Sequence, residues 1–116
     1  MSTVLVVEDS LTDTEVLTRY LRQVGLTVFS VHSGEEAQAR LRLQKPDLVI
    51  LDVMLPGQSG FELCHDLKTN DDTKQIPVVL CSSKGTEVDK VWGSMLGANA
   101  YLVKPAFLTK SEKMRY

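Results

Sequence analysis

Short apolar runs alternate with longer amphipathic stretches along the chain. Five runs are apolar at nearly every position rather than at every second one, and they occupy Thr3–Val7, Thr27–Val31, 48–51, 76–81 and Ala100–Val103. Runs of this length and pattern are typical of strands that are covered on both faces, as in a parallel sheet between helices. The pattern therefore predicts five buried, parallel strands.

The stretches between these runs have helical spacing and recognisable helix starts. Ser10 is expected to cap a first helix, in which Leu17, Leu21 and Val24 share the inner face and which Gly25 ends. A second helix is expected from the capping-box pair Ser33 and Glu36 to about Leu43, before a proline. A third is expected over 59–68, with Leu63, Cys64 and Leu67 on its inner side.

The fourth predicted helix, 86–96, has a broad apolar stripe that we expect to pack inward. Its members are Val88, Val91, Trp92, Met95 and Leu96. A short helical segment is expected after Pro105. Alternating strands and helices predict a doubly wound, three-layer α/β fold with right-handed crossovers, formed by one domain over residues 1–116. Ligands of such sheets bind just beyond the carboxyl ends of the strands.

Composition excludes several classes of protein. No apolar run approaches the roughly 18 residues of a membrane span, and no basic, signal-like segment opens the sequence. A net charge of -2 provides no basic surface for nucleic acid. Two cysteines, Cys64 and Cys81, are too few for a disulfide framework and suit a reducing cytoplasm as packing residues. His32 and His65 are interpreted as surface residues.

Polar residues follow four of the predicted strands. They are Glu8 and Asp9, then Asp52, then Ser82 and Ser83, and finally Lys104 before Pro105. A single acid after a strand is usually a helix cap or a solvated loop residue. Here, however, polar residues follow four different strands of the same predicted sheet. Carboxylates gathered at one edge repel one another unless a cation lies among them, and oxygen ligands suit Mg²⁺. Carboxylate, Mg²⁺, ammonium and hydroxyl together can stabilise a transferring phosphoryl group.

On these residues the chain resembles the receiver domains of two-component response regulators, over essentially its whole length up to Pro105. The stretch DKVWGSMLGANAYLVKP is also similar to receivers of pilus-motility and phototaxis systems. The resemblance implies a flavodoxin-like sandwich with strand order 2-1-3-4-5. It also implies a single-domain regulator without an attached output domain. Gly57 and Gly60 are assigned to loop geometry and helix entry.

The resemblance assigns a role to each polar residue at the strand ends. Asp52 would be the phosphoryl acceptor and also one of the metal ligands. Asp9 would hold Mg²⁺ directly and Glu8 through water, and the backbone carbonyl of Met54 would complete the protein ligands. Lys104 would pair with the acidic cluster and then with the phosphoryl oxygens.

Further roles concern the response to phosphorylation. The hydroxyl of Ser82 would bind a phosphoryl oxygen, and Tyr101 would be the aromatic switch residue that moves with it. The bond from Lys104 to Pro105 would be cis.

The last helix is expected to be short. The face formed by the fourth helix, the fifth strand and this last helix would then be incomplete, and the protein would be mostly a monomer or weak dimer.

Three function classes remain to be separated. The leading hypothesis is a phosphorylation-switched module, not an enzyme, that receives its phosphoryl group from a histidine kinase or phosphotransfer protein and docks to a downstream effector. No nucleic acid or membrane is expected as a partner. A degenerate receiver acting only as a scaffold normally loses the acids or the lysine. An aspartyl-phosphate hydrolase carries a DxD motif after its first strand, whereas here the candidate nucleophile follows the third strand and position 54 is methionine.

Overall fold

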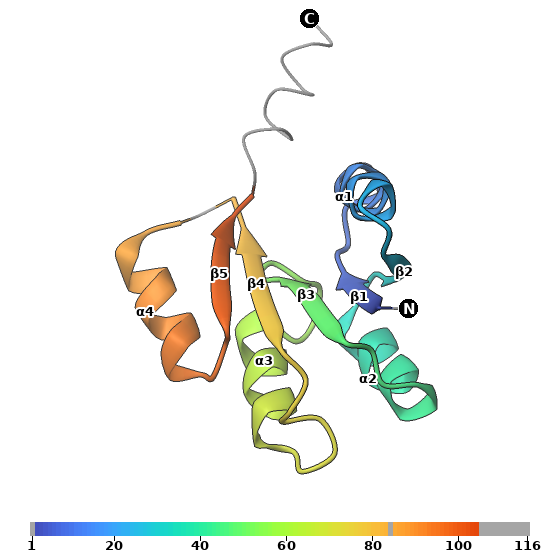
Figure 1. Ribbon diagram of the computed structural model, residues 1–116. Helices are drawn as coiled ribbons and strands as arrows, with labels where there is room; N and C mark the ends of the chain where they lie inside the picture. The colour runs from blue at the N-terminus through green and yellow to red at the C-terminus, as the bar shows by residue number, and fades with distance from the viewer. Residues whose placement is uncertain (1, 84, 105–116) are drawn as a thin grey trace, which may run out of the picture.

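The computed structural model describes residues 2–83 and 85–104. In chain order its elements are β1 (Thr3–Val7), α1 (Leu11–Gln23), β2 (Thr27–Val31), α2 (Gly34–Leu43), β3 (Leu48–Asp52), α3 (Gly60–Thr69), β4 (Val78–Ser82), α4 (Glu87–Met95) and β5 (Ala100–Val103). All strand pairs are parallel, and the order across the sheet is β2-β1-β3-β4-β5 (Figure 1). The doubly wound fold and its strand order are therefore confirmed. The expected last helix and the Lys104–Pro105 bond lie outside the described residues.

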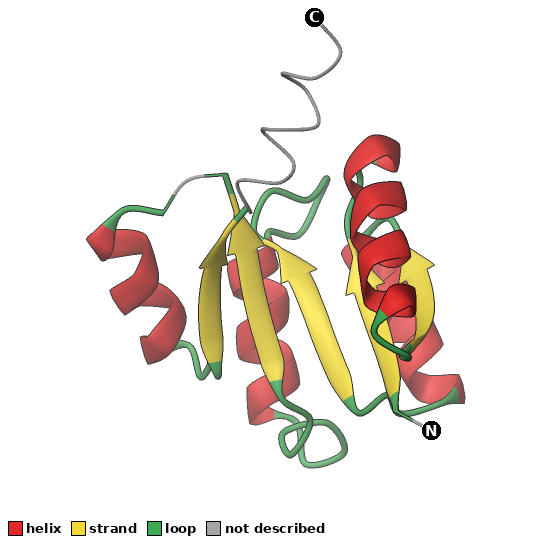
Figure 2. Ribbon diagram, turned by 45° about the horizontal axis from the view of Figure 1, so that its top comes forward, coloured by secondary structure: helices red, strands yellow, loops and turns green. Residues whose placement is uncertain are grey.

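Two apolar clusters cover the two faces of the sheet. α2 and α3 pack on one face, where Leu41, Leu63 and Leu67 meet side chains of β1, β3 and β4. α1 packs on the other, where Leu17 and Leu21 lie against a smaller cluster around Val6. Figure 2 shows α1 on one side of the strands and α3 on the opposite side. The central strands are thus buried from both sides, which explains why their sequences are apolar at every position.

The helices begin where the sequence predicts. Ser10, Ser33, Ser59 and Thr86 are the N-cap residues, and each side chain accepts a hydrogen bond from the backbone N–H three residues further on. These bonds satisfy a donor that the helix itself leaves unpaired. The expectation for Val24 is wrong: its side chain is exposed, because α1 ends at Gln23 and the chain turns through Gly25 with a φ of +92°.

α3 and α4 differ in what they bury. On α3 the predicted inner residues Leu63, Cys64 and Leu67 are all buried. On α4 only Gly93 is buried, whereas Val88 is 77% and Trp92 48% exposed. The expectation that this apolar stripe packs inward is therefore wrong for α4, including the packing assigned to Trp92.

Close packing at Gly93 gives the physical reason. A Cβ atom at this position would lie 2.9 Å from Cδ1 of Leu80 and 3.2 Å from Cδ2 of Tyr101. The helix therefore meets the sheet through its backbone at Gly93, and its larger apolar side chains stay exposed. Among the described residues, no helix is long and apolar enough to cross a membrane.

Candidate functional site

The predicted polar residues meet at one edge of the sheet. Glu8 and Asp9 follow β1, Asp52 ends β3, Ser82 ends β4 and Lys104 follows β5. The strand register brings these ends to similar levels, since Val7 pairs with Leu51, Asp52 with Cys81, and Ser82 with Val103. The parallel sheet thus places side chains that are far apart in the sequence around one site.

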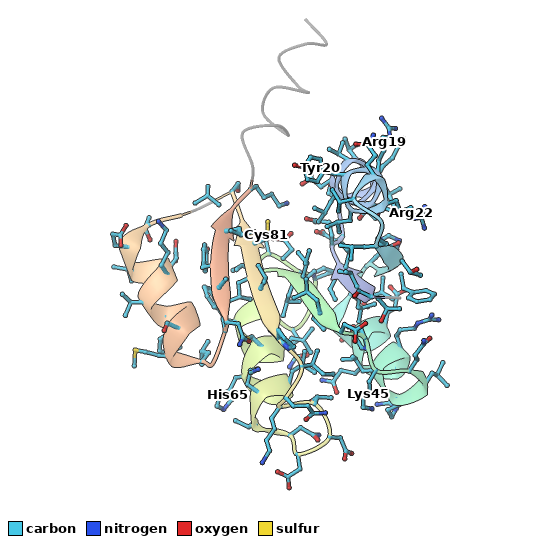
Figure 3. All side chains as sticks on the ribbon, viewed as in Figure 1. Arg19, Tyr20, Arg22, Lys45, His65 and Cys81 are labelled. Carbon is cyan, nitrogen blue, oxygen red and sulfur yellow. The ribbon has the colours of Figure 1, made fainter. Side chains whose placement is uncertain are left out.

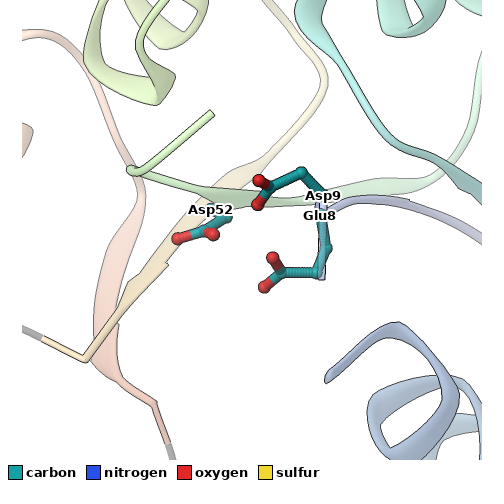
Figure 4. A group of neighbouring side chains, drawn as sticks. All are labelled: Glu8, Asp9 and Asp52. Atoms are coloured by element: carbon teal, nitrogen blue, oxygen red, sulfur yellow. The ribbon is translucent and has the colours of Figure 1, made fainter. Parts of the chain in front are cut away.

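Three carboxylates converge at the centre of this edge. Glu8, Asp9 and Asp52 each offer an oxygen atom, and these three atoms lie within 4.8 Å of one another. Figure 4 shows the side chains approaching one another from the ends of β1 and β3. Glu8 and Asp52 are each only 4% exposed, whereas Asp9 is exposed. Two of the acids are therefore held in a poorly hydrated environment, and the third lies at its rim.

This crowding disfavours negative charge on Glu8. Burial and, to a smaller extent, the neighbouring Asp52 raise the pKa of Glu8 to about 7, although hydrogen bonds from Lys104 and from the Ser10 backbone act in the opposite direction. A set of oxygen donors with too little positive charge among them fits a hard divalent cation. The acidic triad is thus able to hold such an ion.

The ammonium group of Lys104 faces this cluster. Its Nζ atom lies 2.9 Å from Oε1 of Glu8 and 3.5 Å from Oδ2 of Asp52. Burial alone would lower the pKa of Lys104, but hydrogen bonds to Asp13 and Glu8 outweigh it and raise the pKa. Lys104 is therefore firmly charged and placed beside the predicted acceptor.

Asp13 is a further acid at this site that the sequence pattern did not predict. Its Oδ2 atom lies 2.6 Å from Nζ of Lys104, which makes it the shortest of the three acidic contacts of this lysine. Asp13 lies in the first turn of α1, four residues after Asp9 in the sequence. That four-residue spacing could have indicated a fourth acid at this edge, but an acid in the first turn of a helix is ordinarily explained by the helix dipole.

The backbone around Asp52 holds its carboxylate in place. The N–H of Met54 donates to Oδ1 of Asp52 at 3.2 Å, and the N–H of Gly60 donates to the carbonyl oxygen of Val53 at 2.8 Å. A Cβ atom at Gly60 would clash with the carbonyl oxygen of Asp52, so only glycine allows α3 to start this close to β3. This supports the role of helix entry for Gly60. The carbonyl of Met54 as a metal ligand stays a prediction.

Ser82 and Tyr101 are coupled to each other in this structure. Ser82 is buried beside the acids, and Tyr101 is half-buried and packs against the larger apolar cluster. Burial raises the pKa of Tyr101, and a side-chain hydrogen bond with Ser82 works against this shift. The two residues that the resemblance names as switch partners are therefore in direct contact.

The two histidines differ. His65 is exposed and points outward from α3, as expected (Figure 3). His32 is not a simple surface residue: its ring is half-buried, and Nδ1 lies 2.9 Å from the carbonyl oxygen of Glu8. A carbonyl can only accept, so Nδ1 must carry the hydrogen. His32 therefore helps to fix the backbone that carries the acidic pair.

The two cysteines are packing residues, as predicted. Cys64 and Cys81 are free and buried. Burial raises the pKa of each thiol to about 11, so neither forms a thiolate readily near neutral pH. Cys81 lies on β4 (Figure 3), where it pairs with Asp52 of β3, and it packs in the smaller apolar cluster.

Comparison with known proteins agrees with this geometry. The sequence model of the response regulator receiver domain matches residues 4–114. Protein PilH of Pseudomonas aeruginosa is 39% identical over 105 residues, which are 90% of this chain and 87% of PilH. Three further curated relatives are transcriptional regulators, of which the chain spans 40% to 45% of the length.

Solved structures show the same fold. A response regulator from Chloroflexus aurantiacus has a TM-score of 0.86 and 38% identity, covering 90% of this chain and 85% of its own. The Mn²⁺-bound form of response regulator Rcp1 has a TM-score of 0.85 and 31% identity, covering 98% and 88%. The chain therefore belongs to the response regulator receiver domains, which are signalling modules of two-component systems and not enzymes beyond their own phosphorylation chemistry.

Proposed function

We propose that this receiver accepts a phosphoryl group on Asp52 from a phosphohistidine of a histidine kinase or phosphotransfer protein. The observation that carries this proposal is the position of Asp52, which is buried beside the acids Glu8 and Asp9 and lies 3.5 Å from Nζ of Lys104. Charge on a phosphoryl group bound there would be met by Lys104 and by a cation held by the acids.

In the proposed reaction, a carboxylate oxygen of Asp52 forms a bond to phosphorus. The bond from phosphorus to the donor's imidazole nitrogen breaks, and its electron pair stays on that nitrogen. The product is an acyl phosphate on Asp52. No separate base is required because a carboxylate has no proton to lose, so positioning and charge neutralisation provide the catalysis.

The metal ion that fits the site is Mg²⁺. Asp9 and Asp52 would hold it directly, Glu8 through water, and the Met54 carbonyl would complete the protein ligands. Its chemical contribution would be to neutralise negative charge on the phosphoryl oxygens. The oxygen-only donor set and the raised pKa of Glu8 support this choice, as does the Mn²⁺-bound form of the relative Rcp1.

Ser82 and Tyr101 would transmit the change. A serine hydroxyl has one donor and two acceptor sites. Ser82 could therefore donate to a phosphoryl oxygen and keep its contact with Tyr101, which packs beside Gly93 of α4. A local change of charge would in this way reach α4.

Signalling would then follow from docking to an effector protein through the exposed apolar residues of α4. These are Val88, Val91, Trp92 and Met95, each between 48% and 77% exposed. Apolar side chains gathered on one helix are suited to a protein partner. We place the protein in the cytoplasm as a monomer or weak dimer, with no nucleic acid or membrane as a direct partner.

Labelling tests the phosphoryl acceptor. Incubation with acetyl phosphate and Mg²⁺ should add one base-labile phosphoryl group, observed as a mass increase of the intact protein. Asp52→Asn should abolish the increase, and so should a chelator. Asp47→Asn, which changes an exposed acid at the opposite edge of the sheet, is the control and should be labelled normally.

The alternatives give different results. A scaffold without phosphoryl chemistry would show no labelling of the parent protein, and labelling of Asp52→Asn equal to that of the parent would refute the acceptor. A hydrolase would release phosphate from added aryl phosphates with repeated turnover, which we do not expect.

Trp92 provides a direct probe of α4 because it is the one tryptophan of the chain. Its side chain is about half exposed, so its fluorescence responds to a change in the surroundings of α4. Addition of beryllofluoride with Mg²⁺ should shift the emission of the parent protein and leave Asp52→Asn unchanged. Identical spectra with and without beryllofluoride would contradict the proposed path to α4.

A further inference from the structure

Asp13 and the predicted acceptor Asp52 contact the same ammonium group, that of Lys104. Four carboxylates lie at this edge. Those of Glu8, Asp13 and Asp52 contact Lys104, and that of Asp9 lies close to Glu8 and Asp52. Of the three that contact Lys104, Asp13 is nearest at 2.6 Å and Asp52 is farthest at 3.5 Å. We infer that Asp13 is a positioning residue that holds Lys104 away from Asp52 and so limits the phosphorylation of Asp52.

The local role of Asp13 in α1 does not account for this contact. Asp13 is the third residue after the N-cap Ser10, where an acid commonly accepts a bond from the N–H of the N-cap residue. Here that N–H donates instead to Oε2 of Glu8, at 3.0 Å. The backbone N–H of Asp13 bonds to the Ser10 hydroxyl, and its carboxylate is directed to Lys104, 91 residues away in the sequence. The carboxylate of Asp13 is thus engaged across the fold.

Burial makes this contact strong enough to matter. The side chains of Lys104 and Asp13 are 17% and 23% exposed, so their pairing is screened less than that of a surface ion pair. Charge-assisted hydrogen bonds of this length are stronger than neutral ones. A phosphoryl group on Asp52 would need the ammonium group of Lys104. The attraction between Asp13 and Lys104 therefore works against a contact between Lys104 and that phosphoryl group.

Asp13 is distinct from the metal-binding acids. The group of carboxylates whose oxygen atoms lie close enough to share a cation contains Glu8, Asp9 and Asp52, without Asp13. Removing the charge of Asp13 should therefore release Lys104 without removing a metal ligand. This inference rests on the proposed function, because it describes how readily Asp52 is phosphorylated.

Initial rates of labelling by acetyl phosphate test the competition. Asp13→Asn keeps the size of the side chain and should be labelled faster than the parent by about threefold or more, the change expected when part of a charge-assisted hydrogen bond is lost at a partly exposed site. Asp13→Glu should restore a rate near that of the parent. Glu15→Gln removes the same charge from an exposed position of the same helix, where Glu15 pairs with Arg19, and should leave the rate unchanged.

The outcomes separate the two proposals. A parent protein that takes up no phosphoryl group refutes the proposed function and the competition together. A labelled parent with an equal or slower rate for Asp13→Asn refutes only the role of Asp13. An equal gain for Glu15→Gln would show a general effect of charge and would also refute that role.

A metal-free double-mutant cycle tests the contact without any phosphoryl chemistry. The melting temperatures of the parent, Asp13→Asn, Lys104→Met and the double variant are measured in chelator. If Asp13 attracts Lys104, Asp13→Asn lowers the melting temperature more, or raises it less, when Lys104 is present than when methionine replaces this lysine. Equal effects in both backgrounds would overturn the inference even if the labelling rates differ.

Discussion

α3 and α4 lie on the same side of the sheet and have similar apolar periodicity, yet they differ in how much they bury. α3 buries Leu63, Cys64 and Leu67 over the middle of the sheet. α4, next to the four-residue edge strand β5, buries only Gly93 and exposes its larger apolar residues. The comparison shows that the centre of the sheet, which carries the acidic site, is tightly packed, whereas the helix beside the edge strand is lightly packed and leaves apolar side chains exposed.

Truncation of one apolar side chain on each helix gives the largest expected contrast. Leu63→Ala should lower the free energy of unfolding by about 3 kcal/mol, because it leaves a cavity under a fully buried position. Met95→Ala removes a side chain of similar size from α4, where it is 72% exposed, and should change stability by less than about 0.5 kcal/mol. Urea unfolding measures both, and comparable losses would show that α4 is packed as firmly as α3.

The acidic site on the packed centre should make stability depend on pH. Burial holds the pKa of Glu8 at about 7, above the value of 4.5 of an unperturbed glutamate. The folded protein therefore keeps a proton that the unfolded chain releases, so this stabilisation is complete below pH 4.5 and is lost as the pH rises through 7. The raised pKa of Lys104 makes stability depend on pH only above pH 10.5, so it does not contribute to the change between pH 4.5 and pH 7.

Urea unfolding in chelator between pH 5 and pH 8 measures this effect. The free energy of unfolding of the parent should fall by about 1.4 kcal/mol for each pH unit between pH 5 and pH 7, because this range lies between the pKa of Glu8 in the unfolded chain and its pKa in the folded protein. Glu8→Gln should remove most of the dependence and be more stable than the parent at pH 8. A variant less stable than the parent at pH 8 would contradict the account of repelling, buried acids.

Gly93 tests why α4 exposes its stripe. Gly93→Ala should lower stability by about 1 kcal/mol, since overpacking against Leu80 exceeds the gain in helix propensity. The exposed position Ser94 is the control, because Ser94→Ala gains helix propensity at a position open to solvent and should be neutral or slightly stabilising. Stabilisation by Gly93→Ala would mean that α4 does not rest on the sheet through its backbone.

Loss of the hydrogen bond between Ser82 and Tyr101, which connects the centre of the sheet to its edge, should give the smallest change in stability. Tyr101→Phe removes the phenol that bonds to Ser82 and should lower stability by about 0.5 to 1 kcal/mol. The same substitution in a Ser82→Ala background should have little further effect, because the bond is already lost. A full, additive loss in that background, measured by urea unfolding, would show that the two side chains are not coupled.

Much of the fold could be predicted from local patterns. Strands buried on both faces must be apolar at every position, and the N-cap residues Ser10, Ser33, Ser59 and Thr86 satisfy a local need of each helix. The acids after β1 and β3 were also predictable, because parallel strands bring their carboxyl ends to one edge. The roles of Lys104 and Tyr101 came from resemblance to a family and remain proposals.

Other features were decided by tertiary structure alone. A helical pattern shows which residues share a face of α4, but only the close approach at Gly93 determined that this face does not meet the sheet. The contacts of Asp13 with Lys104 and of His32 with the Glu8 carbonyl join segments far apart in the chain. The direction of the Asp13 and His32 side chains depends on partners that are distant in the sequence. Only folding brings these partners close, so the local sequence does not predict the contacts.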